Sequence, residues 1–429
     1  MSFLDGFLDT RPLRSSPAFR RLWVGTTLSG LGGQLTMVAV LYQVWELTGS
    51  PAAVGALGLV RAVPMVVFGL VGGSLADAVD RRRLVLLTTV GQLGVAVMLA
   101  VQAFTELRSY AVLLVLVAVQ SVGGALGAPA RRTFVPRLLP AEQVTAGVAL
   151  SHVSFQFAML GGPALGGLVI AHAGIGVCYL VDSITFLAAL YGVRGLPAMR
   201  PVGLPARPGI RTVWEGWRFI ATRPALGGAF LTDVFATVLA MPIALFPVVN
   251  AERFGGRPET LGLFFTAIAV GGVVAGAVSG RVARSGRPGV VMLVTAGVWG
   301  VGLAGFGLAP YLWLALGCLA VAGAADTFSV ISRGSIVQLA TPDSHRGRVS
   351  AVELIVGASG PDVGNFRAGL VGDVTSATFA LVAGGVMCVA GVAGVAATNR
   401  SLRRFSPTAD VAGEPEESGE PGEGLRTAV

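Results

Sequence analysis

Gly72-Gly73-Ser74-Leu75-Ala76-Asp77-Ala78-Val79-Asp80-Arg81-Arg82-Arg83-Leu84 is a short charged stretch between two long apolar runs of the chain. The glycines at its start allow two helices to pack closely, as helices inside a membrane require. Asp77 falls at the C-terminal end of the first run, where the helix dipole disfavours an anion, so its carboxylate needs a nearby arginine or the N-terminus of another helix. Arginines in such a loop are typical of a segment held at a membrane face. The stretch therefore predicts two membrane-spanning helices joined by a tight charged loop.

The composition of the whole chain is that of a membrane protein. Hydrophobic residues make up 53% of the 429 residues and charged residues 13%, whereas soluble domains carry about 25% charged residues. The mean hydropathy is +0.74, and apolar runs of about 20 residues, long enough to cross a bilayer, repeat along the chain. We therefore expect an all-α polytopic membrane protein embedded in a lipid bilayer. Residues 1–22 contain charges and lack the short apolar core of a cleavable signal peptide.

Twelve apolar segments form two halves of six, separated by a segment rich in proline and arginine. This segment contains Trp214, Trp217 and Phe219 at near-helical spacing, which is typical of an amphipathic helix at a membrane interface. The expected spans are roughly 22–46, 52–76, 84–104, 110–130, 144–171, 175–195, 225–250, 259–283, 289–309, 311–334, 349–373 and 376–398. The expected organisation is an N-terminal segment (1–21), a six-helix bundle (22–195), a linker with the amphipathic helix (196–224), a second six-helix bundle (225–398) and an acidic, disordered tail (399–429).

The placement of arginine predicts the orientation of the chain. Arginines are frequent at the N-terminus, after the last span and in the 2–3, 4–5, 6–7, 8–9 and 10–11 loops, whereas the 1–2, 5–6 and 9–10 loops have none. Because arginine-rich loops stay on the cytoplasmic side, both termini and the linker are expected in the cytoplasm, with the spans in a bacterial inner membrane. The net charge of +8 reflects this topology and not nucleic-acid binding, because the arginines are not interleaved with aromatic residues.

The two halves carry an internal repeat. Ser16-Pro17-Ala18-Phe19 opens the first span, and Arg223-Pro224-Ala225-Leu226 opens the seventh. Two halves of the same orientation imply an axis along the membrane normal, with a substrate site between the halves near the middle of the membrane. Six residues of the first half recur 202 positions later: Arg131, Pro140, Gly162, Gly167, Leu168 and Val169 match Arg333, Pro342, Gly364, Gly369, Leu370 and Val371.

The charged stretch resembles the loop between spans 2 and 3 of the major facilitator superfamily, Gly-x-Leu-x-Asp-Arg-x-Gly-Arg-Arg. Gly73, Leu75, Asp77, Arg81 and Arg82 fall on this pattern, while Ala78 replaces the usual arginine and Asp80 the usual glycine. The resemblance implies two parallel-related six-helix bundles that work by alternating access, with Asp77 docking toward the N-terminus of span 11 in the state closed to the cytoplasm.

Residues of about 16–400 look like the branch of this superfamily that contains the enterobactin exporters and the macrolide efflux proteins. The resemblance is carried by Ser16-Pro17-Ala18-Phe19-Arg20, the charged stretch, Gly216-Trp217-Arg218-Phe219, Arg287-Pro288-Gly289, Thr341-Pro342-Asp343 and Gly347-Arg348-Val349.

A second motif bears on the direction of transport. Gly162-Pro163-Ala164-Leu165-Gly166-Gly167, in the fifth span, resembles the Gly-Pro-x-x-Gly-Gly motif associated with proton-driven antiporters of the superfamily. Proline frees backbone groups and bends a membrane helix, and Gly162, Gly166 and Gly167 allow close packing against a neighbour. The alternative is a kinked, glycine-rich span without a role in coupling. Together with the family resemblance, the motif favours export over import.

Charged residues inside the spans are functional candidates, because each is costly in a bilayer unless it is paired or hydrated. Arg61 in span 2 and Asp362 in span 11 fall at a similar depth, so we expect an Arg61–Asp362 contact across the two halves; the alternative is two independent charges in a hydrated cavity. Asp233 in span 7 and Asp326 in span 10 are candidates for carrying protons. Arg333, seven residues after Asp326, suits a gate at the cytoplasmic end.

Two further charged side chains complete the expected site. Glu353 falls in the first turn of the expected span 11, where an anion suits the helix dipole, and it is grouped with Arg333 as a gate. Arg367, like Arg61, would suit an anionic catecholate cargo if it faces the cavity, whereas a cationic drug would suit exposed carboxylates such as Asp233. Five polar residues could line the cavity or bond to neighbouring helices. They are the three glutamines Gln34, Gln43 and Gln120, together with His152 and Gln156.

The motifs exclude an enzyme and predict a transporter. A Walker-type phosphate loop needs a lysine, which this chain lacks, and no Ser/His/Asp set has a suitable spacing. Cys178, Cys318 and Cys388 lie in apolar runs without metal-ligand spacing, so we expect no metal and no cofactor. We expect a monomeric exporter that exchanges a small organic molecule for protons, with an enterobactin-type siderophore as first choice and a macrolide or other drug as second. A transporter-like sensor or scaffold without flux is the alternative from a different class.

Overall fold

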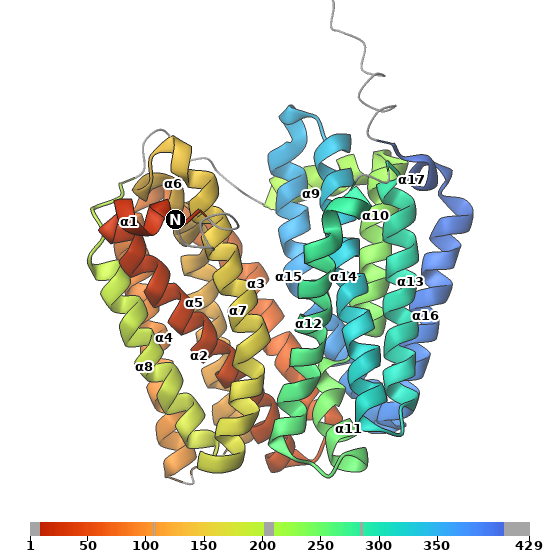
Figure 1. Cartoon of the computed structure of the whole chain (residues 1–429), viewed down its shortest axis with the longest axis horizontal. Helices are drawn as coiled ribbons and strands as arrows, with labels where there is room; N and C mark the ends of the chain where they lie inside the picture. The colour runs from red at the N-terminus through yellow and green to blue at the C-terminus, as the bar shows by residue number, and fades with distance from the viewer. Residues whose placement is uncertain (1–8, 106, 108, 201–209, 284–285, 407–429) are drawn as a thin grey trace, which may run out of the picture.

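The computed structural model describes residues 9–105, 107, 109–200, 210–283 and 286–406. Within these residues every regular element is helical and there is no β-strand (Figure 1). The expected disorder of the acidic tail concerns residues 407–429, which lie outside the described part of the chain. The proline-rich part of the expected linker, 201–209, lies outside it as well.

The first half contains eight helices. They are α1 (Arg11–Ser15), α2 (Pro17–Thr48), α3 (Pro51–Ala78), α4 (Arg81–Phe104), α5 (Tyr110–Arg132), α6 (Phe134–Leu138), α7 (Ala141–Ala173) and α8 (Ile175–Arg194). The start of α2 is set by local sequence, because Ser16 accepts a hydrogen bond from the Phe19 amide at 3.2 Å and Pro17 occupies the first turn. Ser50 and Pro51 start α3 in the same way. The helix bounds confirm the predicted spans of this half to within a few residues.

The second half follows the same order with one interruption. It contains α9 (Ile210–Thr222), α10 (Pro224–Val234), the π-helical turn η2 (Phe235–Leu239), the short 3₁₀-helix η3 (Ile243–Leu245), α11 (Phe246–Arg253), α12 (Pro258–Ala283), α13 (Pro288–Leu308), α14 (Leu312–Ala340), α15 (Asp343–Val374), α16 (Ala377–Thr398) and α17 (Arg400–Arg404). The expected continuous seventh span is therefore broken between Leu239 and Ile243. Pro242 cannot donate a helical hydrogen bond, which favours a break at this point.

Eleven helical segments in the described part of the chain are long and apolar enough to cross a membrane. Helix α15 is 32 residues long but is not apolar enough to be among them. It occupies the place of the predicted span 11 and packs against α3, α9, η2 and α16. Its inner charged residues Glu353, Asp362 and Arg367 face other helices or the cavity described below, as ionisable residues inside a membrane protein usually do. With α15, the bundle contains the twelve predicted spans.

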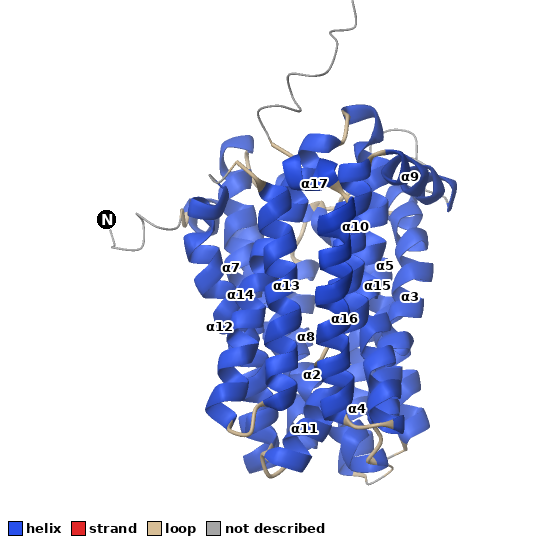
Figure 2. Ribbon diagram, turned by 90° about the vertical axis from the view of Figure 1, so that its right-hand side faces the viewer, coloured by secondary structure: helices blue, strands red, loops and turns tan. Residues whose placement is uncertain are grey.

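Helix α9 is the predicted amphipathic helix. Figure 2 shows that it lies across one end of the bundle, with Trp214 70% exposed. Its other face docks on the start of α15, where Glu215 lies 3.1 Å from Arg348 and Phe219 stacks on His345 with ring centroids 4.3 Å apart.

The two halves contact each other at one end of the molecule. They meet near α11 and diverge toward α1 and α17 (Figure 1), and we call these ends the α11 side and the α1 side. At the α11 side the Ser50 hydroxyl donates to Asp373 at 2.6 Å. The repeat glycines Gly167 and Gly369 also lie there, and a Cβ on either would collide with the carbonyl oxygen of Pro258 or Pro51 in the opposite half. Glycine at these positions is what lets α7 pack on α12 and α15 on α3.

Candidate functional site

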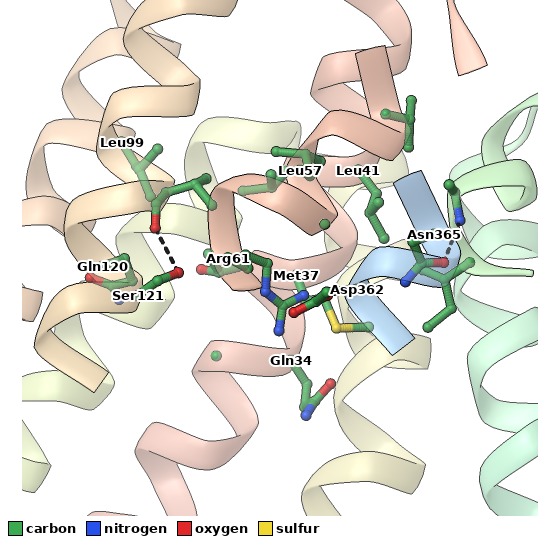
Figure 3. A pocket seen from close by; sticks show the side chains of 18 of the residues that line it. Gln34, Met37, Leu41, Leu57, Arg61, Leu99, Gln120, Ser121, Asp362 and Asn365 are labelled. Carbon is green, nitrogen blue, oxygen red and sulfur yellow. Dashed lines mark hydrogen bonds between the residues drawn. The ribbon is translucent and has the colours of Figure 1, made fainter. Parts of the chain in front are cut away.

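A cavity of about 270 Å³ lies between the two halves near the middle of the bundle (Figure 3). Most of its wall comes from α2, α3, α4 and α5, and η3 and α15 close it from the second half. A concave, largely apolar site with a few polar groups is the usual form of a small-molecule site. The apolar wall includes Met37, Leu41, Leu57 and Leu99, and the polar groups are Gln34, Arg61, Gln120, Ser121, Asp182, Asp362 and Asn365.

Arg61 and Asp362 line this cavity from opposite halves (Figure 3). Helices α3 and α15 approach closely because Gly58 packs against the backbone of Asp362. The charge of Arg61 acts electrostatically on the Asp362 carboxyl, yet no direct ion pair between these two described residues is formed. The structure therefore brings the expected partners together in one cavity while leaving space between their charged groups.

Asp182 of α8 reaches the same cavity and is completely buried. Its carboxylate accepts a hydrogen bond from the Thr36 hydroxyl of α2 at 2.8 Å and lies 3.4 Å from the Thr185 hydroxyl. Its hydrogen-bond partners are therefore hydroxyl groups. Asp182 is not among the residues predicted from the sequence to line the cavity.

The three glutamines separate into two groups. Gln34 and Gln120 line the cavity. Gln43 does not, because its amide exchanges hydrogen bonds of 3.1 Å with Gln102 and accepts one of 2.6 Å from the Tyr179 hydroxyl. This buried group ties α2, α4 and α8 together, as polar side chains do between membrane helices.

A second charged group lies within the second half and centres on Arg333 of α14. The Arg333 guanidinium forms a buried ion pair with Asp233 of α10, and its Nε lies 3.9 Å from a Glu353 oxygen of α15. Asp326 is exposed two turns before Arg333 on α14, and the charges of Asp233 and Arg333 both act on it. Arg333 and Glu353, which were expected to act together, are therefore neighbours. The expected helix-capping position of Glu353 is wrong, because α15 begins at Asp343.

Arg367 is held by the break in span 7. Its Nε donates to the Val238 carbonyl at 2.9 Å, and its terminal nitrogen donates to the Leu239 carbonyl. Asn365 binds the other side of the break, accepting from the Ala244 amide at 3.2 Å. Buried carbonyls that leave a helix need such donors. The structure thus gives Arg367 a place outside the cavity wall, where it holds the broken helix and does not face a cargo.

The charged stretch that opened the sequence folds back on itself. Arg81 donates to the Asp77 carboxylate at 3.2 Å and to the Ala76 carbonyl at 3.1 Å, which caps α3. Asp80 starts α4 by accepting from the Arg83 amide at 3.2 Å, and its second oxygen accepts from the Met199 amide. Of the two alternatives for Asp77, an arginine is the partner in this conformation. The replacement of the glycine usual in the family pattern by Asp80 has a local reason, because an aspartate is a good N-cap.

The remaining residues of the two motifs serve helix contacts. Leu75 packs on a small apolar cluster where α4 begins and α5 ends. Arg82 donates to the Arg194 carbonyl at 2.7 Å. Gly73 lies near the end of α3. In α7, Gly162 and Gly166 pack against Gln34 and Leu35 of α2. On the other face of α7, Gly167 packs on Pro258 and the Pro163 carbonyl on Gly262, both in α12. The Gly-Pro motif thus lies against one helix of each half.

Residues 9–415 of the chain match the family described as transmembrane secretion effector. The chain belongs to this family of the major facilitator superfamily. Two curated relatives are the enterobactin exporters EntS of Shigella boydii serotype 18 and of Escherichia coli O139:H28. They are 28% and 27% identical to this chain over 360 residues, which is 83% of this chain and 86% of theirs.

Solved structures of other transporters share the fold. The nucleoside transporter NupG superposes with a TM-score of 0.69 at 14% identity, covering 91% of this chain and all of its own. A bacterial homologue of the iron transporter ferroportin, solved in an inward-facing state, gives 0.68 at 16% identity over 91% of this chain and 99% of its own. These likenesses show the fold. The family match and the curated relatives show that the protein is a secondary transporter of a small molecule and not an enzyme, and that it is a multi-pass protein of a bacterial inner membrane.

Proposed function

We propose that this protein exports a siderophore of the enterobactin type from the cytoplasm by alternating access. The observation that carries the proposal is the cavity between the halves, where Arg61 faces Asp362, in a molecule whose halves meet at the α11 side and diverge toward the α1 side (Figure 1). The names of the curated relatives support the choice of cargo. An anionic catechol oxygen is a suitable ligand for the Arg61 guanidinium.

The direction of transport rests on the orientation of the chain. Arginine placement favours cytoplasmic termini, so the α1 side, where the halves diverge, would face the cytoplasm and admit cargo. The six-helix bundles at 22–195 and 225–398 are proposed as the two moving units, with a single chain as the working transporter. The Gly-Pro motif of α7 and the acidic residues Asp233 and Asp326 support exchange for protons, and the Arg333–Glu353 neighbours support a gate.

The cargo is tested by measuring where siderophore accumulates. An Escherichia coli strain without its own exporter EntS is starved of iron, with and without this gene, and intracellular and secreted enterobactin are quantified by mass spectrometry. Restored secretion with a fall in the intracellular pool is the expected result. Unchanged partitioning would reject the siderophore. The same strains are then tested for macrolide susceptibility, because a macrolide or other drug is the second choice of cargo. The absence of any flux would favour a sensor or scaffold.

Reversing the two cavity charges separately should damage transport more than reversing them together. Arg61→Asp and Asp362→Arg each place like charges opposite one another, and we expect at least about a tenfold loss of transport rate, which corresponds to about 1.4 kcal/mol. The double variant should recover a large part of this loss. Asp343→Arg, at an exposed position, is the control for charge reversal. No recovery in the double variant would mean that the two charges act independently.

Asp326→Asn should separate transport from the proton gradient. Asparagine cannot bind and release a proton, so export in inverted vesicles should lose its dependence on an imposed pH difference while cargo exchange continues. The control is Asp343→Asn, which makes the same change at the exposed start of α15. If transport by Asp326→Asn follows the pH difference as in the native protein, Asp326 does not carry the proton.

A further inference from the structure

A second cavity lies inside the first half, and Arg131 of α5 is its central charge. It has a volume of about 520 Å³ and is enclosed by α2, α4, α5, α6, α7 and α8. One terminal nitrogen of Arg131 donates to the Thr89 hydroxyl at 3.0 Å and to the Gln92 amide oxygen at 2.9 Å. Its Nε–H is buried without a hydrogen-bond partner among the described residues. Both partners are neutral, so the guanidinium charge has no internal counter-ion there.

The internal repeat shows what is missing around Arg131. Its counterpart 202 positions later is Arg333, which is neutralised by Asp233 and approached by Glu353. Asp233 follows Pro224 by nine residues, and the residue nine after Pro17 is Thr26.

The second acid is replaced in the same way. Glu353 follows Arg333 by twenty residues, and the residue twenty after Arg131 is Ser151. Thr26 and Ser151 both line the cavity around Arg131. The first half therefore keeps the arginine and replaces both of its acids with hydroxyl groups.

We propose that Arg131 and the hydroxyls around it form a binding site for an organic anion, such as a carboxylate or a catecholate. A partly buried guanidinium without an internal counter-ion favours an anionic partner, and its free N–H can be satisfied by an anionic oxygen at charge-assisted strength. The hydroxyls of Thr26, Ser151 and Ser154 line the same cavity. Each donates to a carbonyl of its own helix in this conformation and would rotate to donate to the ligand. An aromatic ring of the ligand would lie against Trp23 and Phe155, which complete the wall.

The position of the site makes it an initial binding site for cargo next to the central cavity. Gln34 lines both this cavity and the central one, and its carbonyl oxygen is buried without a partner among the described residues. An anion bound at Arg131 would thus be separated by one side chain from the cavity that holds Arg61. The assignment of this site as an initial cargo-binding site rests on the proposed export function, whereas anion binding at Arg131 does not.

The test measures binding to the purified full-length protein, without transport. The probe is 2,3-dihydroxybenzoate, and the matched ligand is 2,3-dihydroxybenzamide, which has the same rings and hydroxyls without the carboxylate charge. Trp23 reports on the site by its fluorescence, because it lines the cavity and its indole donates to the Leu150 carbonyl at 3.1 Å. Trp23→Phe should abolish the fluorescence change while equilibrium dialysis still detects the bound acid.

Three variants decide the proposal. Arg131→Gln should bind the acid about tenfold to a hundredfold more weakly, as expected for loss of a charge-assisted contact, and should bind the amide as the native protein does. Arg131→Lys should recover part of the affinity. Thr26→Asp should reduce binding as strongly as Arg131→Gln, because it supplies the counter-ion that the second half already has. The control is Arg20→Gln, at an exposed arginine of α2, which should bind normally.

Size exclusion and thermal unfolding must first show that the native protein and Arg131→Gln are both folded. Equal binding of the acid to the two proteins would then overturn the proposal. Equal binding to Thr26→Asp would overturn the role of the missing acids. If the acid binds at Arg131 but enterobactin secretion is not restored in cells, the anion site stands and the siderophore assignment fails.

Discussion

Asp233→Asn is expected to lower the stability of the protein more than any other single carboxylate substitution in the second half. The substitution leaves the Arg333 guanidinium buried and facing only Glu353, whose oxygen is 3.9 Å from its Nε. Removing one member of a buried ion pair costs about 3–5 kcal/mol, since the other charge stays buried without compensation. The measurement is the thermal unfolding midpoint of the purified protein in one detergent.

A surface ion pair offers the matched comparison. Asp343 and Arg346 lie 2.7 Å apart with side chains that are 86% and 61% exposed, and such pairs contribute little. Asp343→Asn should therefore leave the midpoint nearly unchanged. Adding Arg333→Gln to Asp233→Asn should restore part of the lost stability, because no uncompensated charge remains. A midpoint for Asp233→Asn equal to that of Asp343→Asn would show that the buried pair does not stabilise the second half.

Gly167→Leu is expected to open the contact between the halves at the α11 side. A Cβ at Gly167 would lie 2.5 Å from the Pro258 carbonyl oxygen and 3.0 Å from the Glu259 Cα. Overpacking of this kind typically costs about 1–3 kcal/mol, which would shift an equilibrium between two conformations by about 5- to 150-fold. The cost falls on the described conformation, so the protein should move toward the one that separates α7 from α12.

The shift can be followed as a distance between the halves at the α1 side. Spin labels at Arg83 and Arg346, which are exposed at the starts of α4 and α15, report this distance by pulsed electron paramagnetic resonance. Gly167→Leu should increase the population with a short distance and reduce transport. Gly161→Leu is the control, because a Cβ at Gly161 meets no atom within 4 Å. The same distance distribution in both variants would refute the packing argument.

Much of the fold follows from local sequence. The apolar length of each span sets where the chain crosses the bilayer, and caps such as Ser16 and Asp80 set where helices begin. The two motifs also predicted which glycines lie at helix contacts. Helix α15 is the exception, because it has the length and the place of a span but lacks the apolar composition of one.

The site could be predicted only in part, because helical spacing tells which face a side chain occupies and not what lies opposite. Their positions along spans 2 and 11 predicted that Arg61 and Asp362 lie at a similar depth in the membrane, and the structure brings them into one cavity. Spacing could not show that Arg367 would bind the carbonyls of a broken helix, since the break and its partner are on different helices.

The membrane character, most span bounds and the internal repeat can be read from the amino-acid sequence, because they depend on apolar length and local hydrogen bonding. Which buried charges are neutralised depends on the packing of helices that are distant in sequence. Asp233 and Arg333 are 100 residues apart and pair, while Arg131, with the same repeat position, bonds to a hydroxyl and an amide. The physical reason is that a buried charge is compensated by whatever neighbouring helices place beside it, and that is set by packing.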